Sequence, residues 1–383
     1  MKILLITDRF GDKIPTGVIS RRLCEELKDL GHEIAVVSSQ RIGEKWLYGP
    51  HVICNSKTII PARVLISLSN FFGKNLSSFM WRRRAFKASL KLIRSFKPDV
   101  IYARSTPISA CEVASDLKDM TGIKVMMHFT DPVPAPIEWD PDISYRRRMI
   151  YTMNRILPKA DLISFGNQAM IEYQQNLLKI DFASKSYVSP DPGPSSNLYY
   201  SKPKLKDRLV LVYLGSLYGN RNPQPLFDSI TELNKEGKRV ELKIYDINRV
   251  GTIVPNNVAF VGRTDDVRSA LLDADILVNL DGDDNVPVFI SSKLKEYLFC
   301  GRPIISITPI NSPTRLLTNA LKSVTSVENN VEQIIHAIIN YSEFHYDEDV
   351  FQERSKIIER FNPHNIAKEI SDRLIQLISN YET

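Results

Sequence analysis

The chain has 383 residues, which is more than a single hydrophobic core usually supports, and its length therefore predicts two domains. Hydrophobic residues make up 43% of the sequence and charged residues 25%, a composition that excludes a disordered or fibrous chain. No apolar run approaches the roughly 20 residues that a membrane span requires, and the opening residues do not resemble a secretory signal. The widely separated cysteines indicate neither a disulfide framework nor a zinc site, so we expect a cytoplasmic protein. They are Cys24, Cys54, Cys111 and Cys300.

The net charge of +6 is unevenly distributed along the chain. Residues 1–190 contain 28 Lys and Arg against 18 Asp and Glu, whereas the remainder contains 22 against 26. The first half is therefore basic and the second half mildly acidic, which bears on where the protein sits in the cell.

Short apolar runs, predicted as strands, alternate with segments of helical periodicity. In the first half these strands are 2–7, 34–38, 99–102, 124–129 and 161–165. In the second half they are 209–214, 240–245, 258–261, 275–280 and 303–307. The strands are apolar throughout, which is typical of parallel sheets covered by helices on both faces. One such helix is predicted at 17–30, where a single apolar stripe repeats at helical spacing. Two series of this kind predict two Rossmann-like, doubly wound α/β domains.

A change in composition marks the boundary between the two domains. Residues 189–204 carry four prolines and several turn-forming residues, which a helix or strand interior would not accept. We therefore expect domains at 1–190 and 191–363. A break at Phe361-Asn362-Pro363-His364 precedes a last amphipathic helix, 364–383.

Residues 288–305 carry the most informative pattern. Ser291 or Ser292 is a suitable N-cap, and Gly301 is a fitting C-terminal stop. A helix N-terminus at the carboxyl end of a parallel sheet attracts anions. Glu296 lies one turn further on, where a carboxylate suits the paired hydroxyls of a sugar.

The segment Ser-Ser-Lys-Leu-Lys-Glu-Tyr-Leu-Phe-Cys-Gly-Arg-Pro-Ile-Ile resembles the donor-binding segment of GT-B glycosyltransferases. The resemblance is to family 4, the retaining enzymes of bacterial surface polysaccharide synthesis. Residues 1–38, Tyr213–Asn222 and 260–278 resemble further parts of that family, so the likeness spans nearly the whole chain. It implies two Rossmann-like domains facing a cleft, with the C-terminal helix crossing back to the N-terminal domain. The first domain would face the acceptor and membrane, and the second would bind the nucleotide sugar.

The resemblance also implies site residues. The catalytic groups would be His128, Arg221 and Glu296. Donor-binding groups would be Gly17, Gly215, Arg221, Arg263, Ser292, Lys293, Leu294 and Glu296. Arg104 and Asp131 would lie at the acceptor side of the cleft. Glu296 would hold the ribose and Arg221 would meet a phosphate. Ser216 stands where the family usually has a phosphate-binding arginine, and Arg263 would take over that role.

Several of these residues have an alternative interpretation. His128 is also explained as a strand-end histidine bonded to a neighbouring loop, and Asp131 as a turn cap. Arg104 fits a solvated surface position equally well, and Gly17 fits a helix start. Val288 stands where family members often carry a first glutamate, so Asp283, Asp284 or Asn285 is a candidate to reach the sugar instead.

The acidic run Asp281-Gly-Asp-Asp284 resembles the metal-binding Asp-x-Asp of a different glycosyltransferase fold. It lies late in the chain, whereas that motif closes an N-terminal domain, so a solvated loop is the favoured interpretation. We predict no metal and no cofactor.

Residues 62–97 contain nine Lys and Arg and no acidic residue, interleaved with aromatic and aliphatic side chains. Such a basic amphipathic stretch suits an anionic membrane surface, and Arg146–Arg148 adds a second basic cluster. The alternative places Trp81 and the phenylalanines in the core and the arginines on a solvated face. No nucleic-acid-binding module is present, so nucleic acid is not an expected partner.

Taken with the resemblance, these features predict a glycosyltransferase that moves a sugar from a UDP- or GDP-linked donor to a glycan or lipid-linked acceptor. We expect retention of configuration, no metal requirement and a peripheral position on the inner face of the cell membrane. Two alternatives remain open: a nucleotide-sugar epimerase of the same fold, and a non-catalytic subunit that docks a partner enzyme to the membrane.

Overall fold

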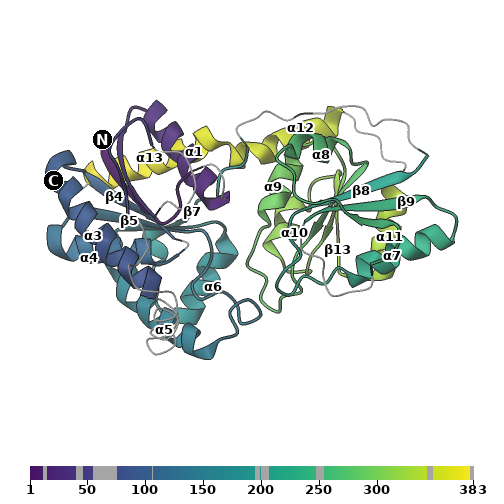
Figure 1. Cartoon of the computed structure of the whole chain (residues 1–383), viewed down its shortest axis with the longest axis horizontal. Helices are drawn as coiled ribbons and strands as arrows, with labels where there is room; N and C mark the ends of the chain where they lie inside the picture. The colour runs from purple at the N-terminus through teal and green to yellow at the C-terminus, as the bar shows by residue number, and fades with distance from the viewer. Residues whose placement is uncertain are drawn as a thin grey trace. The chain divides into compact units, whose positions relative to one another are not determined.

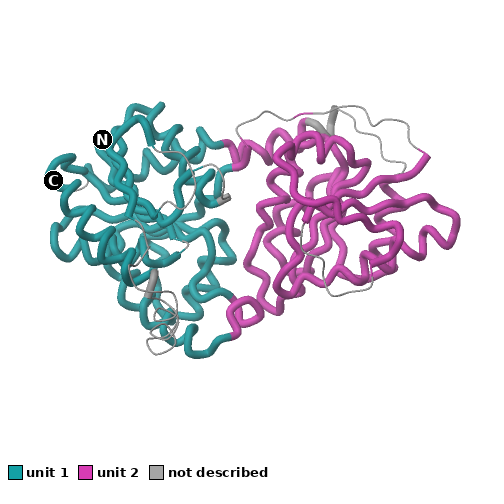
Figure 2. The backbone as a smooth tube through the Cα atoms, in the orientation of Figure 1, with its two compact units in different colours: residues 1–135, 142–192, 363–383 teal, residues 136–141, 193–362 magenta. Residues whose placement is uncertain are grey.

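The computed structural model describes residues 1–11, 15–39, 46–54, 76–105, 107–194, 199, 207–246, 254–342 and 348–379. The chain divides into two compact units (Figure 2). Unit 1 contains Met1–Ala135, Asp142–Pro192 and Pro363–Thr383, and unit 2 contains Pro136–Pro141 and Gly193–Asn362. The expected first domain, 1–190, included residues 136–141, which the structure instead assigns to unit 2.

Unit 1 is built on a seven-stranded parallel sheet in the order β3-β2-β1-β4-β5-β6-β7. Its strands are β1 (Lys2–Thr7), β2 (Glu33–Ser38), β3 (His51–Ile53), β4 (Val100–Arg104), β5 (Lys124–Phe129), β6 (Leu162–Phe165) and β7 (Ser186–Val188). Its α-helices are α1 (Pro15–Asp29), α3 (Leu76–Phe96), α4 (Ser109–Thr121), α5 (Ile143–Ile156), α6 (Gln168–Leu178) and α13 (Pro363–Ser379). Short 3₁₀ turns occupy Leu157–Lys159 and Ala183–Lys185.

The C-terminal helix α13 is part of unit 1 and packs against α1 (Figure 1). Ile366, Ile370 and Leu374 of α13 are buried in the same core cluster as the β1 and β2 side chains. His32 Nε2 also lies 2.8 Å from Ser371 Oγ, a pair 339 positions apart in the sequence. The last helix therefore completes the core of the first unit.

Unit 2 is built on a six-stranded parallel sheet in the order β10-β9-β8-β11-β12-β13. Its strands are β8 (Leu209–Leu214), β9 (Val240–Tyr245), β10 (Val258–Phe260), β11 (Ile276–Leu280), β12 (Ile304–Ile307) and β13 (Val324–Val327). Its helices are α7 (Gln224–Lys235), α8 (Val267–Leu272), α9 (Ser292–Leu298), α10 (Pro313–Thr318), α11 (Val331–Ser342), α12 (Glu348–Ile358) and the 3₁₀ turn Glu359–Phe361.

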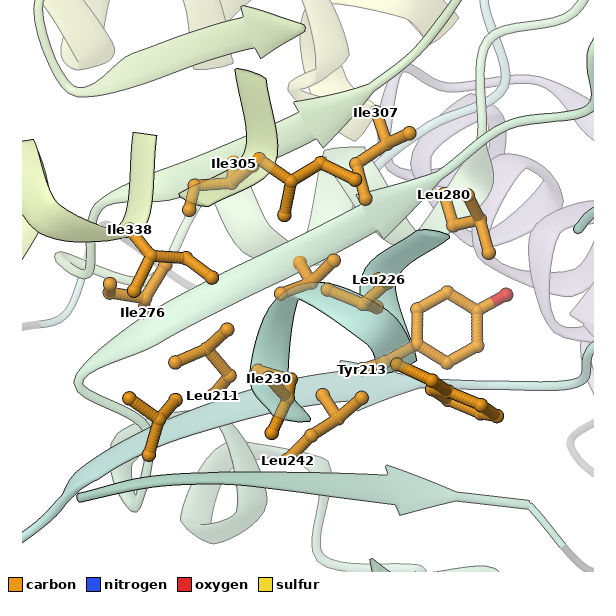
Figure 3. Close-up of a cluster of buried hydrophobic side chains, with 14 of the residues drawn as sticks. Leu211, Tyr213, Leu226, Ile230, Leu242, Ile276, Leu280, Ile305, Ile307 and Ile338 are labelled. Atoms are coloured by element: carbon orange, nitrogen blue, oxygen red, sulfur yellow. The ribbon is translucent and has the colours of Figure 1, made fainter. Parts of the chain in front are cut away.

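Helices cover both faces of the unit 2 sheet. On one face, Leu226 and Ile230 of α7 and Ile338 of α11 pack onto the strands (Figure 3). On the other face, Leu294 and Leu298 of α9 are fully buried in a second cluster. Both units are therefore doubly wound parallel α/β folds, as the sequence predicts.

Four strands, β4, β6, β11 and β12, begin one residue later than the sequence predicts. Pro303 precedes β12, and an aspartate precedes each of the other three. Each carboxylate accepts a hydrogen bond from the main-chain N–H of a neighbouring strand. The bonds run from Lys2 N to Asp99 (2.6 Å), from Val125 N to Asp161 (2.8 Å) and from Val210 N to Asp275 (2.8 Å). These aspartates therefore fix the register of β4, β6 and β11 at the entry to each strand.

Strands β3, β7 and β13 were not predicted. Each lies at an edge of its sheet and is only three or four residues long. Edge strands are half-covered, so they need no continuous apolar run and give a weak sequence signal. Among the described residues, no helix is long and apolar enough to cross a membrane.

Candidate functional site

The order of strands in unit 2 indicates where a ligand would bind. Successive strands are added on one side of β8 to give β9 and β10, and on the other side to give β11, β12 and β13. In open α/β sheets, ligands bind at the carboxyl ends of the strands where this order reverses. In unit 2 that position lies beside Gly215, which follows β8, and Asp281, which follows β11.

Arg221 lies at this position in the loop after β8. Its Nε donates a hydrogen bond to the Leu280 carbonyl (3.1 Å), and its guanidinium stacks 4.4 Å from the Tyr218 ring and 5.4 Å from the Trp139 ring. Nη1 is buried and has no hydrogen-bond partner among the described residues. No carboxylate in the described ranges forms an ion pair with Arg221, so its charge lacks a fixed counterion.

Lys293, in the first turn of α9, brings a second cation to the same place. Its aliphatic stem runs over Gly215, where an added Cβ would lie 1.8 Å from Lys293 Cε, and φ is +124°. Only glycine accommodates that packing and that backbone conformation. Burial, with the positive charge of Arg221, lowers the pKa of Lys293 from 10.5 to about 8. The sequence predicts Lys293 as a donor-binding residue, and the structure brings its side chain to the same loop as Arg221.

Two buried or half-buried carboxylates flank the cations and accept hydrogen bonds from neutral groups. Asp246 accepts from Ser216 Oγ (3.2 Å) and from the Leu217 main chain (3.1 Å), which fixes the loop after β8. Asp281 accepts from Thr308 Oγ1 (2.9 Å) and Asn279 Nδ2 (3.2 Å), and burial raises its pKa above the ordinary value. These carboxylates shape the loops and temper the local positive charge without forming an ion pair with Arg221 or Lys293.

The remaining predicted donor residues lie on α9 and β10. Leu294 is fully buried, so only its main chain is available to a ligand, whereas Ser292 is exposed. Ser291 is the N-cap residue but makes no side-chain hydrogen bond to the helix. Glu296 is partly exposed one turn later. Arg263 is exposed after the edge strand β10, which β9 separates from β8, so the structure does not place it beside Arg221.

In unit 1, Arg104 and His128 belong to one buried polar network. Arg104 donates to Asp191 Oδ1 (2.7 Å) and to the Tyr102 hydroxyl (3.0 Å) and is only 3% exposed. His128 is 1% exposed, with Nδ1 3.0 Å from Ser164 Oγ and Nε2 3.4 Å from Asp191 Oδ1. The interpretation of Arg104 as a solvated or acceptor-facing residue is therefore revised. The contacts of His128 favour its alternative role as a structural strand-end histidine.

Gly17 and Asp131 are the other predicted residues of unit 1. The Gly17 carbonyl accepts from Gly11 N (3.2 Å), and an added Cβ on Gly17 would lie 2.8 Å from the Gly11 oxygen. Its smallness therefore lets the first turn of α1 approach the preceding turn. Asp131 is partly exposed just after β5.

The acidic run after β11 is only partly solvated, which corrects the expectation of a solvated loop. Asp283 is exposed, but Asp284 is 8% exposed and accepts hydrogen bonds from Trp139 Nε1 and Asn220 Nδ2. Asn285 donates to Glu138 (2.9 Å). The run borders a cavity of about 150 Å³ between the loops after β11, β12 and β13. Within the described ranges, no cluster of three or more His, Cys, Asp or Glu could hold a metal ion.

Trp139 and Tyr218 are site residues that the sequence did not reveal. Tyr218 lies only three positions before Arg221, so its proximity could have been inferred from the loop. Trp139 follows a proline-rich stretch with no recognisable motif, and its partners are 79 to 150 positions further along the chain. Only the folded structure brings them together.

The architecture is the GT-B fold, and solved structures of low sequence identity share it. A glycosyltransferase from Rickettsia africae is 14% identical, with 99% of each chain covered and a TM-score of 0.67. The lipopolysaccharide outer core galactosyltransferase WaaB is 15% identical, covers 98% of this chain and 99% of its own, and has a TM-score of 0.66. UDP-GlcNAc 2-epimerase from Methanocaldococcus jannaschii is 12% identical, with 98% and 100% covered and a TM-score of 0.56. No protein-family model matches the sequence, and no curated protein matches it either.

Proposed function

We propose that the chain is a glycosyltransferase. It would move a sugar from a nucleoside diphosphate donor to a glycan or lipid-linked acceptor in surface polysaccharide synthesis. The observation that carries this proposal is the pair of cations, Arg221 and Lys293, at the carboxyl edge of the unit 2 sheet. Withdrawing a charge from water costs several kcal/mol unless an opposite charge compensates it, and a bound diphosphate would supply that charge. The GT-B fold supports the same conclusion by analogy.

In the proposed reaction, the bond between the sugar and the diphosphate breaks and a bond forms between the sugar and an acceptor hydroxyl. Negative charge develops on the departing diphosphate oxygen, which takes up the proton of that hydroxyl. Arg221 would donate hydrogen bonds to that diphosphate through Nη1, and Lys293 would add a second positive charge. Glu296 would accept hydrogen bonds from the ribose hydroxyls. The resemblance to family 4 supports retention of configuration and a reaction without metal.

The test is nucleotide binding by calorimetry with UDP, GDP and TDP, each with and without magnesium. Arg221→Met should weaken the preferred nucleotide by at least about tenfold, because one desolvated charge-assisted contact contributes roughly 1.5–3 kcal/mol. Glu296→Gln should weaken it and sharply lower transfer. Arg239→Met is the matched control, since Arg239 lies in unit 2 with its side chain 71% exposed and paired with Asp207. Wild-type affinity in both Arg221→Met and Glu296→Gln would refute the assignment.

The likeness to an epimerase gives the second candidate function. An epimerase needs acid and base groups around the sugar, and the buried contacts of His128 remove the strongest such group from consideration. Incubating the protein with donor sugar and no acceptor separates the two, because an epimerase changes the donor alone. A docking subunit without activity would leave glycan synthesis unaffected by Glu296→Gln.

We also propose that unit 1 docks on an anionic membrane through α3 and α5. Arg83, Lys87, Lys91 and Arg94 project from the exposed side of α3, and Phe79 is 52% exposed with Arg83 over its ring. On α5, Arg147 is exposed between Ile143 (61%) and Tyr151 (71%). Basic residues beside exposed apolar side chains are typical of membrane-surface binding.

Other residues of the predicted basic stretch have different roles. Trp81 is buried in the core, and Arg82 is paired with Glu112 (2.8 Å) and Asp116 (2.6 Å) of α4. Residues 62–75 lie outside the described residues. The double variant Lys87→Glu/Lys91→Glu should abolish sedimentation with phosphatidylglycerol vesicles, while Lys235→Glu/Lys238→Glu on unit 2 should not. Equal sedimentation of both variants would exclude this surface.

A further inference from the structure

Trp139 packs into a socket in unit 2 that is formed by Tyr218, Asp284 and Phe289. It lies in Pro136–Pro141, whose flanking residues belong to unit 1, and its indole Nε1 donates to both oxygens of Asp284, at 2.8 and 2.9 Å. Its ring packs edge-on against Phe289 (5.4 Å) and Tyr218 (5.8 Å). These contacts fix both the position and the rotation of the indole.

Two glycines give this socket its shape. A Cβ on Gly219, where φ is +68°, would lie 2.7 Å from the Trp139 ring. A Cβ on Gly282 would lie 2.2 Å from Asn220 Oδ1, and Asn220 is the second donor to Asp284. The loops after β8 and β11 can therefore close around Trp139 and Asp284 only because both positions lack a side chain.

Trp139 contacts both Arg221 and the Asp284 carboxylate. Its ring lies 5.4 Å from the Arg221 guanidinium, which the Tyr218 ring also contacts. Stacking on aromatic rings stabilises a guanidinium without using its hydrogen-bond donors. At the same time, the Trp139 and Asn220 donors satisfy Asp284, which is buried and acidic. Without those donors, the Asp284 carboxylate would be stabilised by an ion pair with Arg221. That ion pair would neutralise the positive charge that binds an anion.

We propose that Trp139 is a positioning residue that keeps Arg221 available to a diphosphate. It does so by stacking on the guanidinium and by holding Asp284 through the indole N–H. This inference rests on the proposed function, because it concerns how that site retains an unpaired cation.

Three variants separate the two contributions of Trp139. Trp139→Leu removes the aromatic ring and the N–H, and should weaken binding of the preferred nucleoside diphosphate about tenfold, as removal of a desolvated cation–π contact implies. Trp139→Phe keeps a ring but loses the donor, and should weaken binding about threefold. Trp139→Phe/Asp284→Asn should return to within about twofold of the wild type, because a neutral amide does not attract Arg221. Asp284→Asn alone completes the set, and the control that should bind as the wild type does is Asp207→Asn, whose side chain lies in unit 2 and is 77% exposed.

A merely structural tryptophan would not give this pattern, since a second substitution in the same socket would then worsen binding. The unfolding temperature of each variant is measured alongside, so that affinity is compared among folded proteins. Wild-type affinity in Trp139→Leu and Trp139→Phe, while Arg221→Met loses binding, would overturn the inference and leave the proposed function intact. A double variant as weak as Trp139→Phe would overturn the role of Asp284. If Arg221→Met binds nucleotides as the wild type does while Glu296→Gln loses binding, the inference alone fails. If both variants bind as the wild type does, the proposed function fails and the inference with it.

Discussion

Arg104 in unit 1 and Arg221 in unit 2 both lie at carboxyl ends of parallel strands. They differ in whether a carboxylate pairs with the guanidinium. Arg104 is matched by the Asp191 carboxylate at 2.7 Å and by a tyrosine hydroxyl. Arg221 is held by two aromatic rings and a main-chain carbonyl, and its Nη1 is buried without a partner among the described residues. Removing one member of a buried ion pair leaves the other charge uncompensated and destabilises the fold, whereas a cation without a fixed counterion is available to a soluble anion.

The largest expected effect on stability comes from breaking the ion pair of Arg104 with Asp191. Arg104→Met should lower the free energy of unfolding by about 3–5 kcal/mol, because it leaves the Asp191 carboxylate buried without its counterion. Arg221→Met should leave stability unchanged or higher, since Arg221 forms no ion pair with any described residue. Urea unfolding of both variants at pH 7 measures the difference. Equal destabilisation of the two would mean that Arg221 is also a structural residue.

The next largest effect is the change in diphosphate affinity with pH, which depends on the protonation of Lys293. Its folded-state pKa of about 8 lies below the ordinary 10.5, so the charged form is disfavoured in the free protein and is lost as the pH rises through 8. A diphosphate binds the protonated form, so affinity should fall about tenfold between pH 7 and pH 9. In Lys293→Met the affinity should be weak at both values. Calorimetry between pH 7 and pH 9 measures this change in affinity. If the wild-type affinity does not vary with pH, Lys293 is not part of the anion site.

The lowered pKa of Lys293 also affects the stability of the free protein, which should improve over the pH range in which diphosphate binding weakens. Below pH 8 the unfolded chain holds this proton more tightly than the folded one, so Lys293 destabilises the free protein there. That cost declines as the pH rises from 8 toward 10.5 and is absent above it. The stability difference between the wild type and Lys293→Met should therefore shrink over this interval.

The smallest effect concerns a paired carboxylate of unit 1. Asp161 contacts Lys118, Lys124 and the Val125 main chain; although burial alone would raise its pKa, these contacts lower it below 3.8. Its stabilisation is therefore present above about pH 4 and lost as the pH falls through the folded-state pKa. Asp161→Asn should cost about 1 kcal/mol at pH 7 in urea unfolding, and the difference should shrink as the pH falls through the folded-state pKa of Asp161.

A matched control for this substitution is Asp119→Asn, whose carboxylate is 54% exposed and, among the residues that the structure describes, pairs only with Lys159. It should change stability by less than about 0.5 kcal/mol. If Asp161→Asn and Asp119→Asn lower the free energy of unfolding equally, the hydrogen bond from Val125 N to Asp161 contributes no more than a surface ion pair does.

The fold was predictable because buried parallel strands are apolar along their whole length, so ten strands can be located from the sequence. The edge strands β3, β7 and β13 escaped because three or four half-covered residues give no such signal. Lys293 and Arg221 lie in recognisable segments, but whether their charges are paired depends on side chains distant in the sequence. The burial of His128 and Arg104 likewise depends on Asp191, more than 60 positions away, which no periodicity reveals.

The position of α13 has a consequence for synthesis on the ribosome. Because Ile366, Ile370 and Leu374 fill the core of unit 1, that core stays incomplete until helix α13 has been made. Residues Gly193–Asn362 emerge earlier, and since they form nearly all of unit 2 they can fold while the first sheet still exposes apolar surface. We therefore expect the nascent chain to expose apolar surface of unit 1 after the residues of unit 2 have emerged, which is the stage at which chaperone binding would matter most.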